Sequence, residues 1–159
     1  MRVAPTDKIR WNTFDPHLPT PLAASLKRYR AQPLRFPPLV LLIDDSIDHL
    51  EMYEVALRDR YQVLQADRGE AGIEIAIVHR PDVVVVDLDM PGIDGWEVCR
   101  RLAADSRTAS IPLVILTATD VENQRHVAMR IGVVDLLTKP CQVDLLRDRI
   151  AAALGRSNG

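Results

Sequence analysis

The sequence contains no long hydrophobic run and no strong excess of charge of either sign. No apolar stretch approaches the roughly 20 residues that a membrane-spanning helix needs, and the N-terminus lacks the apolar core of a secretory signal. The net charge of the 159 residues is −2, so the composition gives no sign of nucleic-acid binding. These absences indicate a cytoplasmic protein that binds neither a membrane nor nucleic acid directly.

Cysteine is scarce, and no internal repeat is present. The two cysteines, Cys99 and Cys141, fit a reducing cytosol better than a disulfide scaffold. Cys99 stands at core spacing in a helical pattern, so we expect it to act as a small buried hydrophobe. Hydrophobic residues make up 47% of the chain, which is enough for a packed core.

The first 38 residues differ from the rest in composition. They contain seven of the eleven prolines, both phenylalanines and a net charge of +5, whereas residues 39–159 have a net charge of −7. Pro37-Pro38 marks a boundary, because proline lacks the N–H group and restricts the residue before it. We therefore divide the chain into a basic, proline-rich extension (1–38), one domain (39–155) and a short tail (156–159).

The extension has two possible structures. Its composition is typical of a disordered segment, but aromatic side chains are unfavourable in water. Our hypothesis is that part of it packs on the domain or on a second subunit, with an apolar anchor drawn from Trp11, Phe14 and Phe36. The opposite net charges of the extension and the domain favour this hypothesis.

After the boundary, short apolar runs alternate five times with helical patterns. The expected strands are 39–44, 61–66, 82–87, 111–117 and 133–138. The expected helices are 47–59, 69–80, 96–104, 121–131 and 142–154. Ser46 is the expected N-cap of the first helix. The pattern predicts an α/β fold with a doubly wound, five-stranded parallel sheet and helices on both faces.

The polarity of the strands predicts their order. The first, third and fourth runs are continuously apolar and should be central, whereas the second and fifth are broken by polar residues and should lie at the edges. This sorting matches the flavodoxin-like order 2-1-3-4-5, in which the connections reverse direction between the first and third strands.

Polar side chains follow four of these apolar runs, at the point where each ends. They are Asp44 and Asp45, Asp87, Thr117, and Lys139. In an open α/β sheet, ligands bind beyond the carboxyl ends of the strands. We therefore expect three carboxylates, a hydroxyl and an ammonium group at one place, a set that suits a divalent cation and a phosphoryl group.

Residues 39–155 resemble the receiver domain of bacterial two-component response regulators. The motifs that carry the resemblance are Leu42-Ile43-Asp44-Asp45, Asp87 to Gly95, Leu116-Thr117-Ala118 and Lys139-Pro140. The resemblance implies that Asp87 accepts a phosphoryl group from a histidine kinase or a histidine phosphotransfer protein. It implies further that Mg²⁺ binds Asp45, Asp87 and the backbone carbonyl of Asp89 directly, and Asp44 mostly through water.

The resemblance also assigns the residues around the phosphoryl group. Lys139 would contact the phosphoryl oxygens, Thr117 and Ala118 would form the phosphate-binding switch, and the peptide bond before Pro140 would be cis. Leu136 stands where such domains usually have an aromatic switch residue. The face formed by the fourth helix, the fifth strand and the fifth helix should respond to phosphorylation, and Asp135 and Arg149 are candidates for an ion pair on it.

The implied function is phosphorelay signalling. Phosphorylation would change binding to a downstream protein or self-association as a homodimer, and the only catalysis would be Mg²⁺-dependent self-phosphorylation and autodephosphorylation. No output domain follows, so the resemblance is to the stand-alone, single-domain type, although a longer protein cut at residue 159 would look the same.

Two alternatives stay open. Residues 86–90 also resemble the nucleophile motif of haloacid-dehalogenase-type phosphatases, in which Asp87 would attack a substrate and Asp89 would act as acid and base. The early position of Asp44 and Asp45 and the lack of a cap domain argue against this alternative. The second is a degenerate receiver that serves only as a binding platform, and Leu136 is the one feature in its favour.

Overall fold

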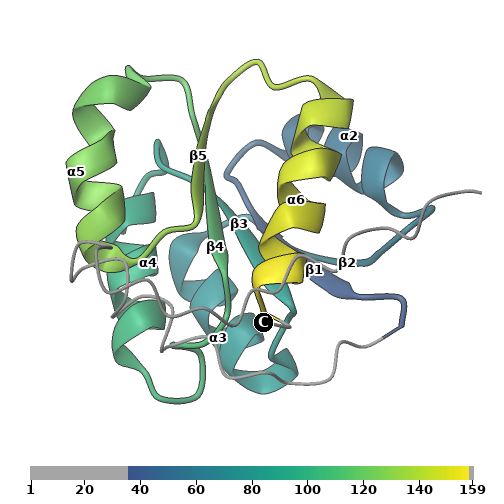
Figure 1. The fold of residues 1–159 in the computed structure, drawn as a ribbon, viewed down its shortest axis with the longest axis horizontal. Helices are drawn as coiled ribbons and strands as arrows, with labels where there is room; N and C mark the ends of the chain where they lie inside the picture. The colour runs from purple at the N-terminus through teal and green to yellow at the C-terminus, as the bar shows by residue number, and fades with distance from the viewer. Residues whose placement is uncertain (1–35, 158–159) are drawn as a thin grey trace, which may run out of the picture.

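A computed structural model describes residues 36–157, which form a single five-stranded sheet with helices on both sides (Figure 1). The strands are β1 (Leu39–Ile43), β2 (Gln62–Ala66), β3 (Val83–Asp87), β4 (Leu113–Thr117) and β5 (Asp135–Thr138). All neighbouring pairs are parallel, and the order is β2-β1-β3-β4-β5. The predicted fold class and strand order are therefore confirmed.

Burial explains this order. Every residue of β1, β3 and β4 is buried, as expected for strands that are covered on both faces. β2 and β5 are only partly buried and lie at the two edges. The apolar runs without polar interruptions therefore identify the central strands.

Two groups of helices cover the sheet. The helices are α2 (Ile47–Leu57), α3 (Gly69–His79), α4 (Gly95–Ala104), α5 (Val121–Ile131) and α6 (Val143–Ser157). α2 and α6 lie together on one face, where Leu50, Tyr53, Leu146 and Ile150 belong to one core cluster (Figure 1). α3, α4 and α5 cover the other face with a second cluster that includes the predicted core residue Cys99.

The helix boundaries follow local chemistry. The Ser46 side chain accepts a hydrogen bond from the His49 N–H at 3.3 Å, so the predicted N-cap is confirmed. α4 begins at Gly95, one residue earlier than predicted, because the Asp94 side chain caps the Glu97 N–H at 2.8 Å. A Cβ atom at Gly95 would lie 2.7 Å from the Leu88 Cα, so glycine lets the helix start directly behind the β3 loop.

The chain enters the sheet at the start of β1, beside the edge strand β2. The carbonyl of Pro38 accepts a hydrogen bond from the Gln62 N–H at 2.9 Å. Phe36 is 97% exposed, so its prediction as an apolar anchor on the domain is wrong. The hypothesis that the extension packs on the domain falls largely on residues 1–35, which lie outside the described part of the chain. Within residues 36–157, no helix is long and apolar enough to cross a membrane.

Candidate functional site

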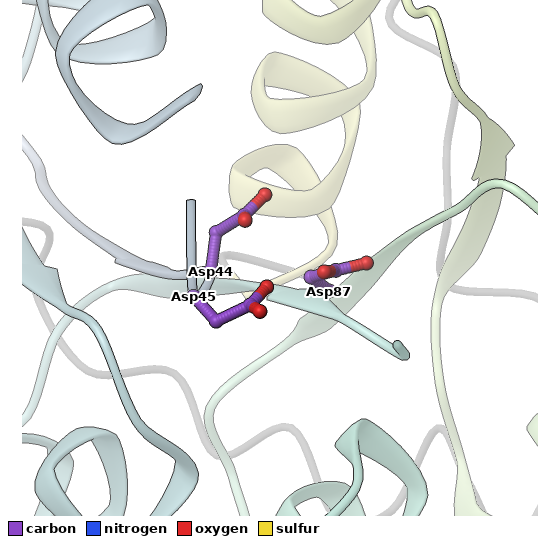
Figure 2. Close-up of side chains that lie close together, drawn as sticks. All are labelled: Asp44, Asp45 and Asp87. Carbon is purple, nitrogen blue, oxygen red and sulfur yellow. The ribbon is translucent and has the colours of Figure 1, made fainter. Parts of the chain in front are cut away.

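Three carboxylates meet at the carboxyl end of the sheet. Asp44 and Asp45 follow β1, and Asp87 is the last residue of β3 (Figure 2). Because β1 and β3 are neighbours, the ends of the two strands bring these residues together, and one ligand oxygen from each lies within 4.8 Å of the others. Asp44 and Asp87 are only 4% and 5% exposed, whereas Asp45 is open to solvent.

Lys139 lies over two of the three carboxylates. Its Nζ is 2.7 Å from Asp44 Oδ2 and 3.3 Å from Asp87 Oδ1. Its backbone N–H donates to the Thr117 carbonyl at 2.7 Å, which joins the end of β5 to the end of β4. The peptide bond between Lys139 and Pro140 is cis, as the resemblance implies. The ammonium group therefore supplies positive charge where two buried carboxylates would otherwise repel each other.

The electrostatic environment shifts two of these groups. Burial raises the pKa of the Asp87 carboxyl above its ordinary value, and the charge of Asp44 adds to this effect while Lys139 opposes it. Burial by itself would lower the pKa of Lys139, but its hydrogen bond and charge interaction with Asp44, together with Asp87, raise that pKa above its ordinary value. The site therefore keeps its lysine charged while it disfavours a second negative charge at Asp87.

His49 belongs to the same group, although the sequence analysis did not assign it to the site. Its Nδ1 is 3.3 Å from Asp44 Oδ2 and 3.3 Å from the Lys139 Nζ. The Ser46 cap fixes the first turn of α2, and this turn directs His49 back towards the end of β1. The expected cap was the sequence feature that could have placed this ring near Asp44.

Hydroxyl and backbone donors complete the site. Thr117, the last residue of β4, is fully buried, and its Oγ1 lies 2.7 Å from the Thr119 Oγ1. The N–H of Thr119 donates to Thr117 Oγ1 at 3.1 Å, and the N–H of Asp89 donates to Asp87 Oδ1 at 3.4 Å. Ala118 is exposed beside Thr117, and the side chain of Asp89 is exposed as well. The structure thus places Thr117 at the end of β4, at the same edge of the sheet as Asp87.

The switch position and the expected surface ion pair lie on β5. Leu136 is half-buried and packs against the core cluster on the α3–α4 face. Arg149 Nη1 lies 3.1 Å from Asp135 Oδ2, which confirms the predicted contact between β5 and α6.

The three carboxylates offer the ligand chemistry of a hard divalent cation. Mg²⁺ prefers oxygen ligands and usually binds through one or two carboxylates while it keeps several waters. Asp45 is exposed and makes no ion pair among the described residues, whereas Asp44 is occupied by Lys139. This difference fits direct metal binding by Asp45 and Asp87, with Asp44 further away.

Comparison with known proteins agrees with this geometry. Residues 40–151 match a protein family described as the response regulator receiver domain. Protein PilH of Pseudomonas aeruginosa is 37% identical over 118 residues, which cover 72% of this chain and 96% of PilH. The transcriptional regulatory protein AfsQ1 of Streptomyces coelicolor is 37% identical over 120 residues, which cover 76% of this chain and 52% of AfsQ1.

A solved structure shows the same fold. Chemotaxis protein CheY4 of Vibrio cholerae matches with a TM-score of 0.70 and 26% identity, covering 73% of this chain and 98% of CheY4. The chain thus spans nearly all of PilH but only about half the length of AfsQ1. Neither the family match nor these relatives support the haloacid-dehalogenase-type alternative.

Proposed function

The chain belongs to the family of response regulator receiver domains, which act in phosphorelay signalling, and we propose that Asp87 is its phosphoryl acceptor. The observation that supports this proposal is the position of Asp87. Its carboxylate is buried at the end of a central strand, beside two more carboxylates and 3.3 Å from Lys139. A nucleophile that must meet an anionic group needs such compensation of charge.

The proposed reaction transfers a phosphoryl group from a phosphohistidine of a kinase or phosphotransfer protein. One Asp87 oxygen forms a bond to phosphorus while the bond from phosphorus to the histidine nitrogen breaks, and the product is an acyl phosphate. Lys139 would bind a phosphoryl oxygen as a point charge, and Thr117 and the nearby backbone N–H groups would donate hydrogen bonds to the others. Transfer from an ATP-dependent kinase would take place in the cytoplasm.

Asp45, Asp87 and the backbone carbonyl of Asp89 would hold Mg²⁺, with Asp44 acting through water. The ion supplies positive charge that lets an anionic donor approach a carboxylate. The same site would accept small phosphodonors and would later hydrolyse its own acyl phosphate.

Phosphorylation would be transmitted to the face made by α5, β5 and α6. A phosphoryl group adds about −1.5 to −2 charges and new hydrogen-bond acceptors, so it would draw the Thr117 hydroxyl towards Asp87. The ion pair between Asp135 and Arg149 lies on this face, and a change there would alter self-association or binding of a downstream protein. Leu136 has no polar group with which to take part.

The acceptor can be tested by labelling with acetyl phosphate and Mg²⁺, followed by intact mass measurement. The wild type should gain one phosphoryl group, and Asp87→Asn should gain none. Asp148→Asn is the matched control, because the exposed side chain of Asp148 lies on α6 and has no role in this proposal. Equal labelling of wild type and Asp87→Asn would exclude Asp87, and an unlabelled wild type would favour the degenerate receiver.

The metal can be tested in the same assay. Asp45→Ala should lose Mg²⁺ binding, and an excess of chelator should stop labelling of the wild type. Full labelling in chelator would contradict a metal-dependent site.

A further inference from the structure

A chain of hydrogen bonds leads from α4 through α5 to Thr117. The Trp96 indole Nε1–H donates to Gln124 Oε1 at 3.0 Å, and Gln124 Nε2 donates to Thr119 Oγ1 at 3.5 Å. The Thr119 hydroxyl lies 2.7 Å from Thr117 Oγ1. Four side chains from α4, α5 and the end of β4 are therefore linked in one line that ends at the buried hydroxyl beside Asp87.

The donors and acceptors in this series of hydrogen bonds are fixed at its Trp96 end. An indole N–H can only donate, so the partner of Trp96 must be the carbonyl oxygen of the Gln124 amide. The amide nitrogen is then the atom that faces Thr119, and it can only donate. Thr119 Oγ1 therefore accepts from Gln124, and its own hydrogen remains for another partner. The Gln124–Thr119 contact is the longest link, and such contacts often tighten when a site is loaded.

The same logic determines the role of the Thr117 hydroxyl. Its oxygen accepts from the Thr119 N–H at 3.1 Å and lies 2.7 Å from the Thr119 Oγ1, a contact in which either hydroxyl can be the donor. The bond from Gln124 fills one acceptor position of Thr119 and so favours Thr119 as the donor. A hydroxyl has two acceptor positions and one hydrogen. When Thr119 is the donor, both acceptor positions of Thr117 are filled, and Thr117 can act towards a further group only as a donor.

We propose that Gln124, oriented by Trp96, is a positioning residue that makes Thr117 a hydrogen-bond donor towards the phosphoryl group on Asp87. This inference rests on the proposed function of Asp87. β3 and β4 are paired so that Asp87 lies opposite Leu116, the residue before Thr117, and the carboxylate and the hydroxyl therefore emerge at the same end of adjacent strands. A hydroxyl whose hydrogen is already free to donate breaks no hydrogen bond of its own when the phosphoryl group draws it towards Asp87.

A purely structural role for the contact between Trp96 and Gln124 is the competing explanation, because it also ties α5 to α4. The two explanations predict different labelling rates for Gln124→Glu. A carboxylate has the same shape and still accepts from Trp96, but it cannot donate to Thr119. The Thr119 hydroxyl would then donate to the carboxylate and accept from Thr117, which withdraws the Thr117 hydrogen from the phosphoryl group.

The experiment measures the rate of labelling by acetyl phosphate and Mg²⁺ in four variants of the full chain. Gln124→Glu should be slowed by about tenfold, the effect of losing one hydrogen bond to a charged group. Gln124→Leu, which removes the link without reversing it, should fall between Gln124→Glu and the wild type. Trp96→Phe should be slowed least, because Gln124 keeps its amide.

Arg125→Gln is the matched control for charge, because it changes the net charge of α5 by the same amount at the neighbouring exposed position. It should label at nearly the wild-type rate. A structural role predicts the opposite order, with Gln124→Leu slower than Gln124→Glu, because only leucine loses the contact with Trp96. That order, or a Gln124→Glu rate equal to that of Arg125→Gln, would overturn the inference.

These results remain separate from the test of the proposed function. An unlabelled wild type would refute the acceptor site itself, whereas a labelled wild type with unaffected variants would refute only the role of Gln124. The indole N–H resonance of Trp96 gives a readout that needs no phosphorylation. It should shift in Gln124→Leu and stay close to its wild-type position in Arg125→Gln.

Discussion

α5 and α6 both lie beside β5, but they are held by different forces. α6 buries Leu146, Ile150, Ala153 and Leu154 against the sheet, whereas Ala128 is the only buried residue of α5. α5 is joined to α4 through the polar contact between Gln124 and Trp96. Segments with few buried apolar contacts open at the lowest free energy. We therefore expect α6 to stay fixed against the sheet and α5 to be the helix that moves more easily.

A second contact joins α6 to the end of α2. The guanidinium group of Arg147 donates from Nε to the carbonyl of Ala56 at 2.9 Å and from Nη2 to Asp59 at 3.1 Å. Ala56 lies in the last turn of α2, where helix carbonyls lack intrahelical partners. Arg147 therefore caps α2 from α6 and holds the two helices together on one face of the sheet.

The largest expected effect tests whether apolar burial holds α6 more strongly than α5. Ile150→Ala in α6 should lower the free energy of unfolding by about 2–5 kcal/mol, because it removes a fully buried side chain from the core. Ile131→Ala in α5 is the matched variant, and it should lose about half as much, because Ile131 is only half-buried. Urea unfolding measures both, and equal losses would contradict the distinction between the two helices.

Removal of the Arg147 hydrogen bonds should have the next largest effect on the free energy of unfolding. Arg147→Met keeps most of the aliphatic part of the side chain but removes its hydrogen bonds, and we expect a loss of about 1.5–3 kcal/mol. Arg149→Met is the control on the same helix, because its ion pair with Asp135 is a surface contact that should contribute at most about 1 kcal/mol. A larger loss in the control would show that Arg147 does not tie α6 to α2.

The sequence predicted the sheet and the residues at the ends of its strands better than it predicted the contacts between helices. Val83 to Val86 and the other apolar runs identified the central strands, because full burial on both faces leaves little room for polar residues. The same strands placed Asp44, Asp87 and Thr117 together, since parallel strands end at one edge of a sheet. These features depend on periodicity, which a single sequence displays.

The remaining contacts depend on how packed helices are oriented, which periodicity does not record. Trp96 and Gln124 are 28 positions apart, and nothing in either helical pattern indicates that they meet. The position of His49 against Lys139 depends in the same way on the loop after β5. α6 also continues through Gly155 to Ser157, past the predicted end at residue 154.

Removal of the buried negative charge of Asp87 should have a smaller effect, and this effect should be stabilising. The pKa of Asp87 is raised, mainly by burial, so ionised Asp87 lowers the stability of the fold above the unfolded pKa of about 3.9. Asp87→Asn should therefore raise the urea midpoint at pH 7 without Mg²⁺. This gain should disappear as the pH falls below about 4, where the carboxyl is protonated in both states.

Added Mg²⁺ should reverse this order if the proposed site binds the ion, because the folded wild type would then bind Mg²⁺ more tightly than the variant. Asp148→Asn, at an exposed position of α6, serves as the control in both conditions. An Asp87→Asn variant that is less stable than the wild type in chelator at pH 7 would show that the contact with Lys139 outweighs the burial of the charge.

The smallest expected effect concerns the extension, whose last residue, Pro38, accepts a hydrogen bond from the N–H of Gln62 in β2. A chain that starts at Leu39 loses a segment with a net charge of +5 next to a domain with −7. We expect it to be less stable by about 1 kcal/mol or less at low salt, and the difference should shrink at high salt, where surface charges are screened. Amide exchange should then rise in β2 and α2, whereas α5 should be unchanged. If the shortened protein melts, sizes and accepts phosphoryl groups like the full chain, the extension is passive, and the comparison between α5 and α6 holds without it.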